Sequence, residues 1–249
     1  MQNKLKTSLR ILAPIIFWCL IWHITSILIG NSFLFPGLRE TLDALIVILA
    51  DKSSYVSILL SSIRVLIGLV AGCILGVILG IACNRFSFIN VIISPLFTII
   101  KSTPVASFIV VLWVLLSGDV LSILIGIIMV MPIIWQNVID GYKSISLELI
   151  EVANVYNFSA LKKFKLLTLP ALKKYLLPAI ITSCGLCWKA EIAAEIIAYT
   201  KKSIGQSIND AKYHLDTPSV FAWTIIIIVF SIILEKTTKI LLRRMLIND

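Results

Sequence analysis

Charged side chains are scarce in this sequence, since Asp, Glu, Lys and Arg make up only 14% of its 249 residues. Soluble domains carry roughly 25% charged residues, so this composition excludes a water-soluble globular protein. Hydrophobic residues account for 59% of the chain, and its mean hydropathy is +1.02. Several apolar stretches exceed the ~18 residues that cross a bilayer, which indicates an integral membrane protein.

Metal-binding and catalytic groups are also sparse. The two histidines lie in unrelated segments, and all five cysteines lie in apolar stretches. Cys184-x-x-Cys187 has the spacing of a metal or redox pair but lacks a second ligand pair, so packing is the better interpretation. Neither a G-x-x-x-x-G-K-[ST] phosphate loop nor a G-x-S-x-G nucleophile elbow occurs. We therefore expect no ATPase site, metal, cofactor or enzymatic activity in this chain.

Six apolar stretches are candidates for membrane spans. Segments of this length without strict alternation must be helical, because only a helix satisfies its own backbone groups in lipid. The predicted fold is an all-α integral membrane protein with about six transmembrane helices. The predicted spans are 11–29, 57–83, 91–116, 121–138, 177–198 and 221–242.

The lysines and arginines between these spans set the expected orientation, because cytoplasmic loops are enriched in them. With a cytoplasmic N-terminus, fourteen of them lie inside and five outside. This distribution predicts a multi-pass protein with both termini in the cytoplasm, and it explains the net charge of +9 without a nucleic acid partner. On the outer side, 36–51 is expected to form an amphipathic helix, and 199–218 a re-entrant or cap element.

Four glycines recur at steps of four in the second span: Gly68, Gly72, Gly76 and Gly80. Each step drifts by about 40° around a helix, so the glycines form a slowly winding groove. The groove predicts a seam where another helix, from the same subunit or a partner, approaches closely. The alternative is a lipid-facing helix that merely tolerates small residues.

A polar and basic island, EVANVYNFSALKKFKLLTLP, runs from Glu151 to Pro170 between the fourth and fifth spans. It is expected on the cytoplasmic side. The pattern predicts an amphipathic element that either docks on a soluble partner or binds membrane lipid. Its apolar strip, at helical spacing, consists of Leu149, Val152, Ala153, Tyr156 and Leu161.

This island resembles the EAA loop of permease subunits from bacterial ATP-binding-cassette (ABC) importers. That pattern is Glu-Ala-Ala, three residues, Gly, and a Leu-Pro pair about a dozen residues later. It appears here as Glu151-Val152-Ala153, Asn157 and Leu169-Pro170. Val152 and Asn157 depart from the pattern, but Asn is second only to Gly in tolerating the left-handed backbone that such a turn uses.

Further motifs, spread over nearly the whole chain, are similar to the nitrate/sulfonate/taurine-type branch of these permeases, the binding-protein-dependent transport inner membrane components. Ser203 stands where the branch usually has the first glycine of a Gly-x-Gly signature. The matching motifs are Ser61-x-x-Arg64-Val65 with Gly68, Pro95 with Pro104-Val105-Ala106, Ala194-Glu195, and Ile204-Gly205.

The resemblance implies a permease of the bacterial plasma (inner) membrane that carries a small solute into the cytoplasm by alternating access. The solute would be anionic or zwitterionic, of the nitrate, sulfonate, taurine or pyrimidine-precursor class. The implied partners are two cytoplasmic ABC ATPase subunits, an extracellular or periplasmic solute-binding protein, a second permease copy and membrane lipid. Residues 1–56 would form the first transmembrane helix and the external helix, and 57–249 the permease core with a coupling loop at 143–176. The implied ATPase-coupling residues are Glu151, Ala153, Asn157, Leu169 and Pro170.

Polar residues within the spans are costly in lipid and should face protein or water. The candidates for a translocation pathway are Lys101, Trp188, Lys189, Glu191 and Glu195. Structural ion pairs and snorkelling side chains are the alternatives. Glu191 and Glu195 share one helix face, so a rival function is an ion-gradient-driven secondary transporter that uses them for coupling. That rival predicts inverted repeats, and the sequence has no convincing pair of matching halves.

Overall fold

The protein is helical throughout, without strands, over the residues that the computed structural model describes: the backbone of 2–247 and the side chains of 13–242. The membrane-sized helices are joined by short helices at both ends of the bundle. In chain order the elements are α1 (Gln2–Ile29), α2 (Leu38–Ala50), α3 (Lys52–Arg85), α4 (Ser87–Ser102), α5 (Val105–Trp113), α6 (Gly118–Lys143), α7 (Leu147–Val155), α8 (Ala160–Lys163), the π-helical turn η1 (Phe164–Thr168), α9 (Leu169–Ala198), α10 (Ile204–Tyr213) and α11 (Thr217–Ile247).

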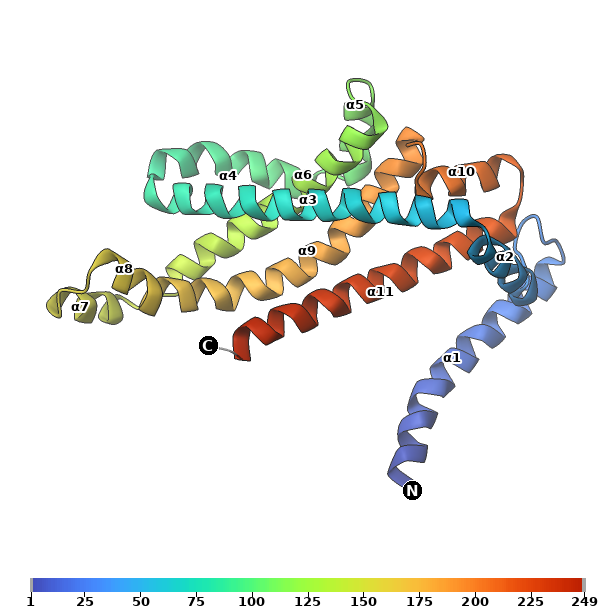
Figure 1. Ribbon diagram of the computed structural model, residues 1–249, viewed down its shortest axis with the longest axis horizontal. Helices are drawn as coiled ribbons and strands as arrows, with labels where there is room; N and C mark the ends of the chain where they lie inside the picture. Colours follow the sequence, from blue (N-terminus) through green and yellow to red (C-terminus); the bar gives the residue numbers. More distant parts are fainter. Residues whose placement is uncertain (1, 248–249) are drawn as a thin grey trace.

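Three long helices form the centre of the bundle, with α6 packed against both α3 and α9 (Figure 1). The contact between α3 and α6 is close because the glycines of α3 face α6. A Cβ placed on Gly72, Gly76 or Gly80 would lie 2.6–2.8 Å from atoms of α6. The four-residue glycine step therefore lies at an interface between two helices of the same chain, away from lipid.

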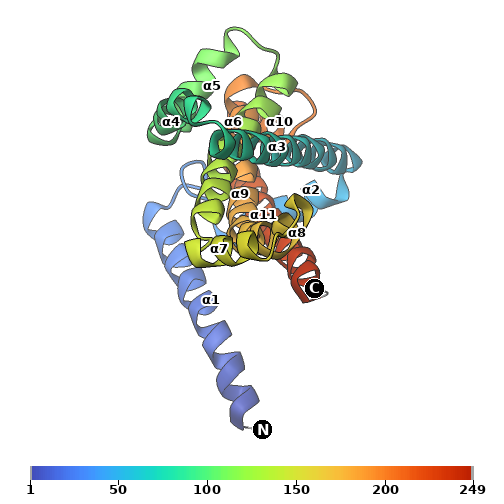
Figure 2. The same ribbon diagram turned by 90° about the vertical axis from the view of Figure 1, so that its left-hand side faces the viewer.

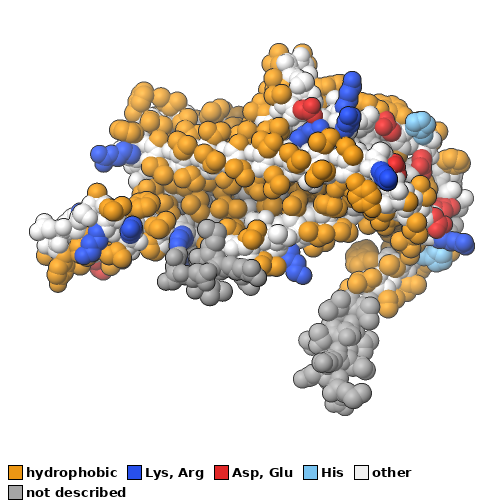
Figure 3. All heavy atoms as spheres, in the orientation of Figure 1, with side chains coloured by type: hydrophobic (Ala, Val, Ile, Leu, Met, Phe, Trp, Pro, Cys, Tyr) orange, Lys and Arg blue, Asp and Glu red, His pale blue; other side chains and the backbone are white. Residues whose placement is uncertain are grey.

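Four described helical stretches are long and apolar enough to cross a membrane: 52–85, 118–143, 160–198 and 217–242. The bent pair α4–α5 makes a fifth span if it is counted as one, and the apolar part of α1, Ala13–Ile29, is shorter. Apolar side chains cover much of the flank between the two ends of the bundle (Figure 3). On α3, for example, Val70, Ile74 and Ile78 are 54–55% exposed. The expected all-α integral membrane fold is confirmed.

The expected continuous span over 91–116 is wrong in one respect, because the chain bends by 101° between α4 and α5. Thr103 is extended, with φ −88° and ψ 134°, and Pro104 follows it. A residue before proline avoids helical angles, and proline itself cannot donate a backbone hydrogen bond. One helix therefore ends at Ser102 and another begins at Val105, and α5 turns to pack on α6 and α9.

The short elements gather at opposite ends of the bundle (Figure 1): α7, α8 and η1 at one end, α2 and α10 at the other. The predicted amphipathic segment 36–51 forms α2, which buries Thr41 and Ile48 and packs against α11. Within 199–218, α10 packs against α9 and α11. Figure 2 shows α1 diverging from the bundle, and Trp22 fastens its C-terminal half by donating from Nε1 to the Pro36 carbonyl (2.9 Å).

Candidate functional site

The α7–η1 segment (residues 147–168) begins as two short helices joined by a left-handed turn. The hydroxyls of Ser146 and Ser159 accept from backbone N–H groups at the starts of α7 and α8, both at 3.3 Å. Between the helices, Asn157 has φ 49°, the left-handed conformation expected of a residue that replaces glycine. The Phe158 N–H donates to the Ala153 carbonyl (2.9 Å), which closes the end of α7.

Several exposed side chains of this segment are apolar, and charged side chains are exposed among them. Leu147, Val155 and Tyr156 are 75%, 78% and 73% exposed. Ala153 is only 1% exposed, so its place in an outward-facing strip is corrected: it lies on the inner face of α7, where a small side chain permits close packing. Of the other predicted coupling residues, Leu169 is half-buried, and the exposed ones are Glu151, Asn157 and Pro170.

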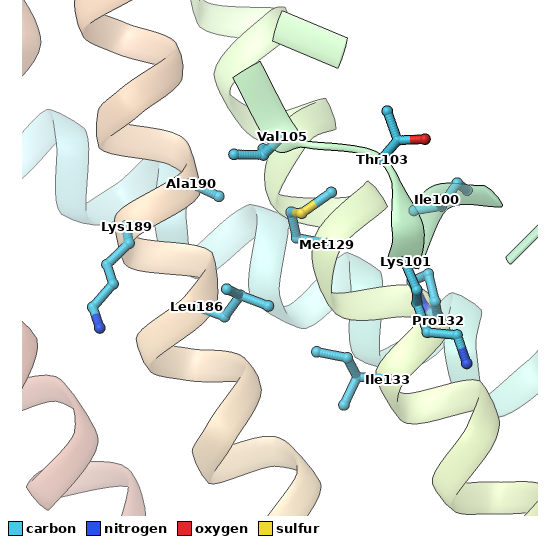
Figure 4. A pocket seen from close by; sticks show the side chains of 10 residues that line it. All are labelled: Ile100, Lys101, Thr103, Val105, Met129, Pro132, Ile133, Leu186, Lys189 and Ala190. Carbon is cyan, nitrogen blue, oxygen red and sulfur yellow. The ribbon is translucent and has the colours of Figure 1, made fainter. Parts of the chain in front are cut away.

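The five predicted pathway residues lie in two different places. Lys101 and Lys189 line a cavity of about 360 Å³ between the α4–α5 bend, α6 and α9 (Figure 4). The remaining three, Trp188, Glu191 and Glu195, are 0% exposed and are packed among helices of the same chain. Of these five residues, Lys101 and Lys189 border this cavity, and the other three are enclosed by protein.

Trp188 fills the contact between α9 and α11. Its Nε1 donates to the Ile227 carbonyl (3.1 Å), and its ring stacks on Phe230 with the centroids 6.1 Å apart. The indole therefore has both its polar and its apolar partners inside the chain. These contacts give it a structural role in the bundle.

Glu191 occupies a slot between α3 and α6 that exists because two glycines face each other there. A Cβ on Gly68 or Gly126 would lie 2.1 Å or 1.8 Å from Glu191 Oε1. The carboxyl group accepts from the Ser122 hydroxyl (3.4 Å) and the Cys187 thiol (3.2 Å). Gly68 continues the four-residue glycine step of α3, but the atom nearest to a Cβ there belongs to Glu191 of α9 and not to α6. The carboxyl group of Glu191 therefore explains why glycine is needed at this position.

Glu195, one helical turn further, is at the centre of a buried polar cluster. Its carboxylate accepts from the Ser61 hydroxyl (2.7 Å), from Arg64 Nη1 (3.1 Å) and from the Gly205 backbone N–H (3.3 Å). The Ser61 oxygen also accepts from the Ile204 N–H (3.0 Å). One carboxylate thus holds the start of α10 against α3 and α9.

Arg64 extends this cluster toward the edge of the bundle. It pairs with Asp119 of α6 through Nη2 (2.7 Å) and Nε (2.9 Å), and it donates to the Lys201 carbonyl (3.3 Å). Arg64 is buried, whereas the Asp119 side chain is 67% exposed. The guanidinium therefore joins a buried carboxylate to one that reaches water. We refer to Ser61, Arg64, Asp119, Glu195 and Gly205 as the Arg64–Glu195 cluster.

Sequence reasoning identified Ser61, Arg64, Glu195 and Gly205 separately as motif residues, but it did not predict that they meet. It gave Asp119 no role at all. The available signal was charge, because opposite charges at the ends of apolar spans must find partners. Gly205 is required by packing, since a Cβ there would lie 2.5 Å from the backbone of Glu195 and Ile196.

Comparison with known proteins places the chain in a family. Residues 68–247, more than two thirds of its length, match the family described as "Binding-protein-dependent transport system inner membrane component". The chain belongs to this family. It is a multi-pass membrane permease of the ABC importer class, as the resemblance predicted. The matched range includes the cavity, Glu191, Glu195 and the whole α7–η1 segment.

Three known permeases are similar to this chain over most of their length and most of its own. It is 22% identical over 231 residues to the taurine transport system permease protein TauC of Escherichia coli, covering 90% of this chain and 83% of TauC. It is 29% identical over 220 residues to the bicarbonate transport system permease protein CmpB of Synechococcus elongatus, covering 84% and 79%. A Bacillus subtilis permease protein named for the transport of aliphatic sulfonates is 25% identical over 189 residues, covering 75% and 68%.

Proposed function

We propose that this permease moves a small anionic or zwitterionic solute into the cytoplasm, with ATP hydrolysed by separate subunits. The solute class is supported by the relatives, which are named for taurine, aliphatic sulfonates and bicarbonate. Two ATPase subunits, a second permease copy and an extracellular or periplasmic solute-binding protein complete the importer. The matched family consists of transport components that depend on a binding protein, which favours this function over an ion-gradient-driven carrier.

The observation that carries the proposal is the apolar surface of the α7–η1 segment. Leu147, Val155 and Tyr156 expose most of their surface at the tip of the bundle, apart from the apolar flank that faces lipid (Figures 1 and 3). An exposed apolar patch bordered by charge is typical of a protein interaction site, and a short amphipathic helix fits a groove in a partner. We assign this surface to ATPase docking.

The segment is also shaped before any partner binds. Its turn is set by Asn157, and Lys163 Nζ donates to Asn154 Oδ1 (2.6 Å), which ties α8 back to α7. A surface that is already ordered loses less conformational freedom on binding, so more of its contact energy contributes to affinity. The same rigidity allows a movement of the ATPase to be transmitted to α6 and α9.

This assignment fixes an orientation. The α7–η1 end faces the cytoplasm, as do both termini, and the end with α2 and α10 faces outward. In the transport cycle, ATP-driven closure of the ATPases displaces the α7–η1 segments and biases the bundle between inward and outward openings. Solute and ATP then act on the same two-state equilibrium.

Two exposed tyrosines provide a matched test of docking. Tyr156, 73% exposed, lies on the α7–η1 segment, and Tyr213, 70% exposed, ends α10 at the opposite end of the bundle. Tyrosines at the centre of an interface commonly contribute 1.4 kcal/mol or more, which is roughly tenfold in affinity. We expect Tyr156→Asp to lower ATPase recovery about tenfold in a detergent pull-down from the native membrane, and Tyr213→Asp to leave it unchanged.

Equal ATPase recovery with the two variants would count against the docking surface. Solute uptake that persists in cells lacking the ATPase, but stops when the ion gradient is dissipated, would refute the ATP-driven mechanism itself. Identification of the copurifying binding protein, followed by a ligand screen of that protein, would establish the solute.

A further inference from the structure

The cavity at the α4–α5 bend lies halfway along the membrane-spanning helices. Met129, Pro132 and Ile133 come from the middle of the 26-residue helix α6, and α9 contributes Leu186 and Ala190. Most of its lining is apolar. Its volume of about 360 Å³ is within the range of small-molecule sites, ~300–1,000 Å³. The cavity is therefore large enough for a small solute at mid-depth in the bilayer.

Two lysines stand at opposite edges of this cavity (Figure 4): Lys101 from the end of α4 and Lys189 from α9. Among the described residues, no Asp or Glu oxygen lies within 4.0 Å of either ammonium group. Lys101 Nζ instead lies 5.7 Å from the centre of the Trp135 ring. An ammonium group without a counter-ion is costly in hydrocarbon, so this wall faces water or protein.

The backbone supports the same conclusion independently. Between α4 and α5 the chain leaves the helical conformation at Thr103 and Pro104, next to the cavity, and the neighbouring Ser102 is exposed. Non-helical backbone at membrane depth occurs only where protein buries it or where it borders a water-filled space. Charge and backbone together indicate that lipid does not cover this face.

We propose that this cavity is a hydrated anion subsite of the permease, in which Lys101 and Lys189 select solutes that carry a sulfonate or carboxylate-type group. The proposal rests on the proposed function and assigns residues to it. The long lysine stems let the ammonium groups turn inward to an anionic head, while Leu186, Met129 and Ile133 contact the carbon part of the solute. Lysine acts as a flexible point charge, and such a site holds an anion loosely enough to release it.

The test measures water access and charge preference without requiring the natural solute. Leu186→Cys, and separately Ile133→Cys, places a thiol on the cavity wall of the intact complex in permeabilised membranes, with and without ATP. The probes are the anionic reagent 2-sulfonatoethyl methanethiosulfonate and its cationic trimethylammonium counterpart. Each rate is divided by that reagent's rate with a free thiol, and the reaction of the unsubstituted chain, with its five free cysteines, is subtracted.

Both introduced thiols should react, and the anionic reagent should be favoured. A unit charge about 10 Å from the thiol, at an effective dielectric constant of about 40, changes each rate roughly fourfold. Lys101→Gln or Lys189→Gln should slow the anionic reagent and speed the cationic one by that factor. Lys101→Arg and Lys189→Arg should preserve the preference. So should Lys236→Gln, which removes an exposed charge of α11 outside the cavity.

Two results would overturn the proposal. One is the absence of modification at both positions in every nucleotide state, in variants that still copurify with the ATPase. The other is modification whose charge preference does not depend on either lysine. Loss of ATPase association with lysine-dependent modification intact would contradict the proposed function alone, so the two failures are distinguishable.

Discussion

Replacing Arg64 by methionine removes the guanidinium and leaves the Glu195 carboxylate, only 1% exposed, with the Ser61 hydroxyl and the Gly205 N–H as its partners. Removing one partner of a buried ion pair typically costs about 3–5 kcal/mol, because the other charge stays buried and uncompensated. The pair with Asp119 adds little, since a carboxylate that is 67% exposed is well solvated. We therefore expect Arg64→Met to lower the free energy of unfolding by about 3–5 kcal/mol, and Asp119→Asn to lower it by less than about 1 kcal/mol.

The assay is unfolding of the purified permease in mixed micelles with increasing dodecyl sulfate, followed by the fluorescence of its six tryptophans. A double-mutant cycle isolates the pair. In Arg64→Met/Glu195→Met no charge is buried alone, so the double variant should be less destabilised than the sum of the single variants by at least ~1.5 kcal/mol. Additivity within about 0.5 kcal/mol, or an Arg64→Met effect as small as that of Asp119→Asn, would refute the idea that Arg64 and Glu195 stabilise each other.

Two further predictions, each with a control substitution, test the backbone at Gly205 and at Asn157. Gly205→Ala should cost more than about 2 kcal/mol in the same unfolding assay, because its Cβ would meet backbone that cannot move aside. Gly185→Ala, whose nearest neighbour would be 3.9 Å away, should stay within about 0.5 kcal/mol; equal effects would contradict the packing argument. Asn157→Gly should retain ATPase recovery, whereas Asn157→Val should reduce it, because a β-branched residue disfavours φ 49° by roughly 1–2 kcal/mol. Equal recovery with both would show that docking does not need the turn.

Some features followed from the sequence because their causes are local. The long apolar stretches could only be helices in lipid. The left-handed turn at Asn157 followed from the resemblance to the EAA loop, which has glycine at this position, together with the tolerance of Asn for that conformation. The bend at Pro104 was not predicted, since hydropathy averaged over about 18 residues continues unchanged through two residues of broken helix. Ala153 was misplaced for a related reason. Helical spacing groups residues on one face of a helix, but it does not show which residues of that face are covered by the rest of the chain.

The contacts of the candidate site were beyond local reasoning. Arg64 and Glu195 are 131 residues apart in the chain, and periodicity relates only neighbours on one helix. The shared face of Glu191 and Glu195 was predictable, but their different surroundings were not. One carboxyl lies in a glycine slot and the other beside a guanidinium, because helices from elsewhere in the chain supply these neighbours. Asp119 was given no role because charged residues are common at the edge of a span, although the opposite charge of Arg64 was a signal that the two could pair.

The close approach of α3 and α6 bears on how the permease can move. At Gly72, Gly76 and Gly80 the side chains of α6 rest against bare backbone, so no intervening side chain can change rotamer to accommodate sliding. A shift along the axis would press Val130 or Ile134 of α6 onto larger neighbours. Packed interfaces of this kind behave as rigid units, and displacement is taken up where contacts are sparser. We therefore expect α3 and α6 to move as one rigid unit in any conformational change of the permease, with the displacement taken up outside their contact.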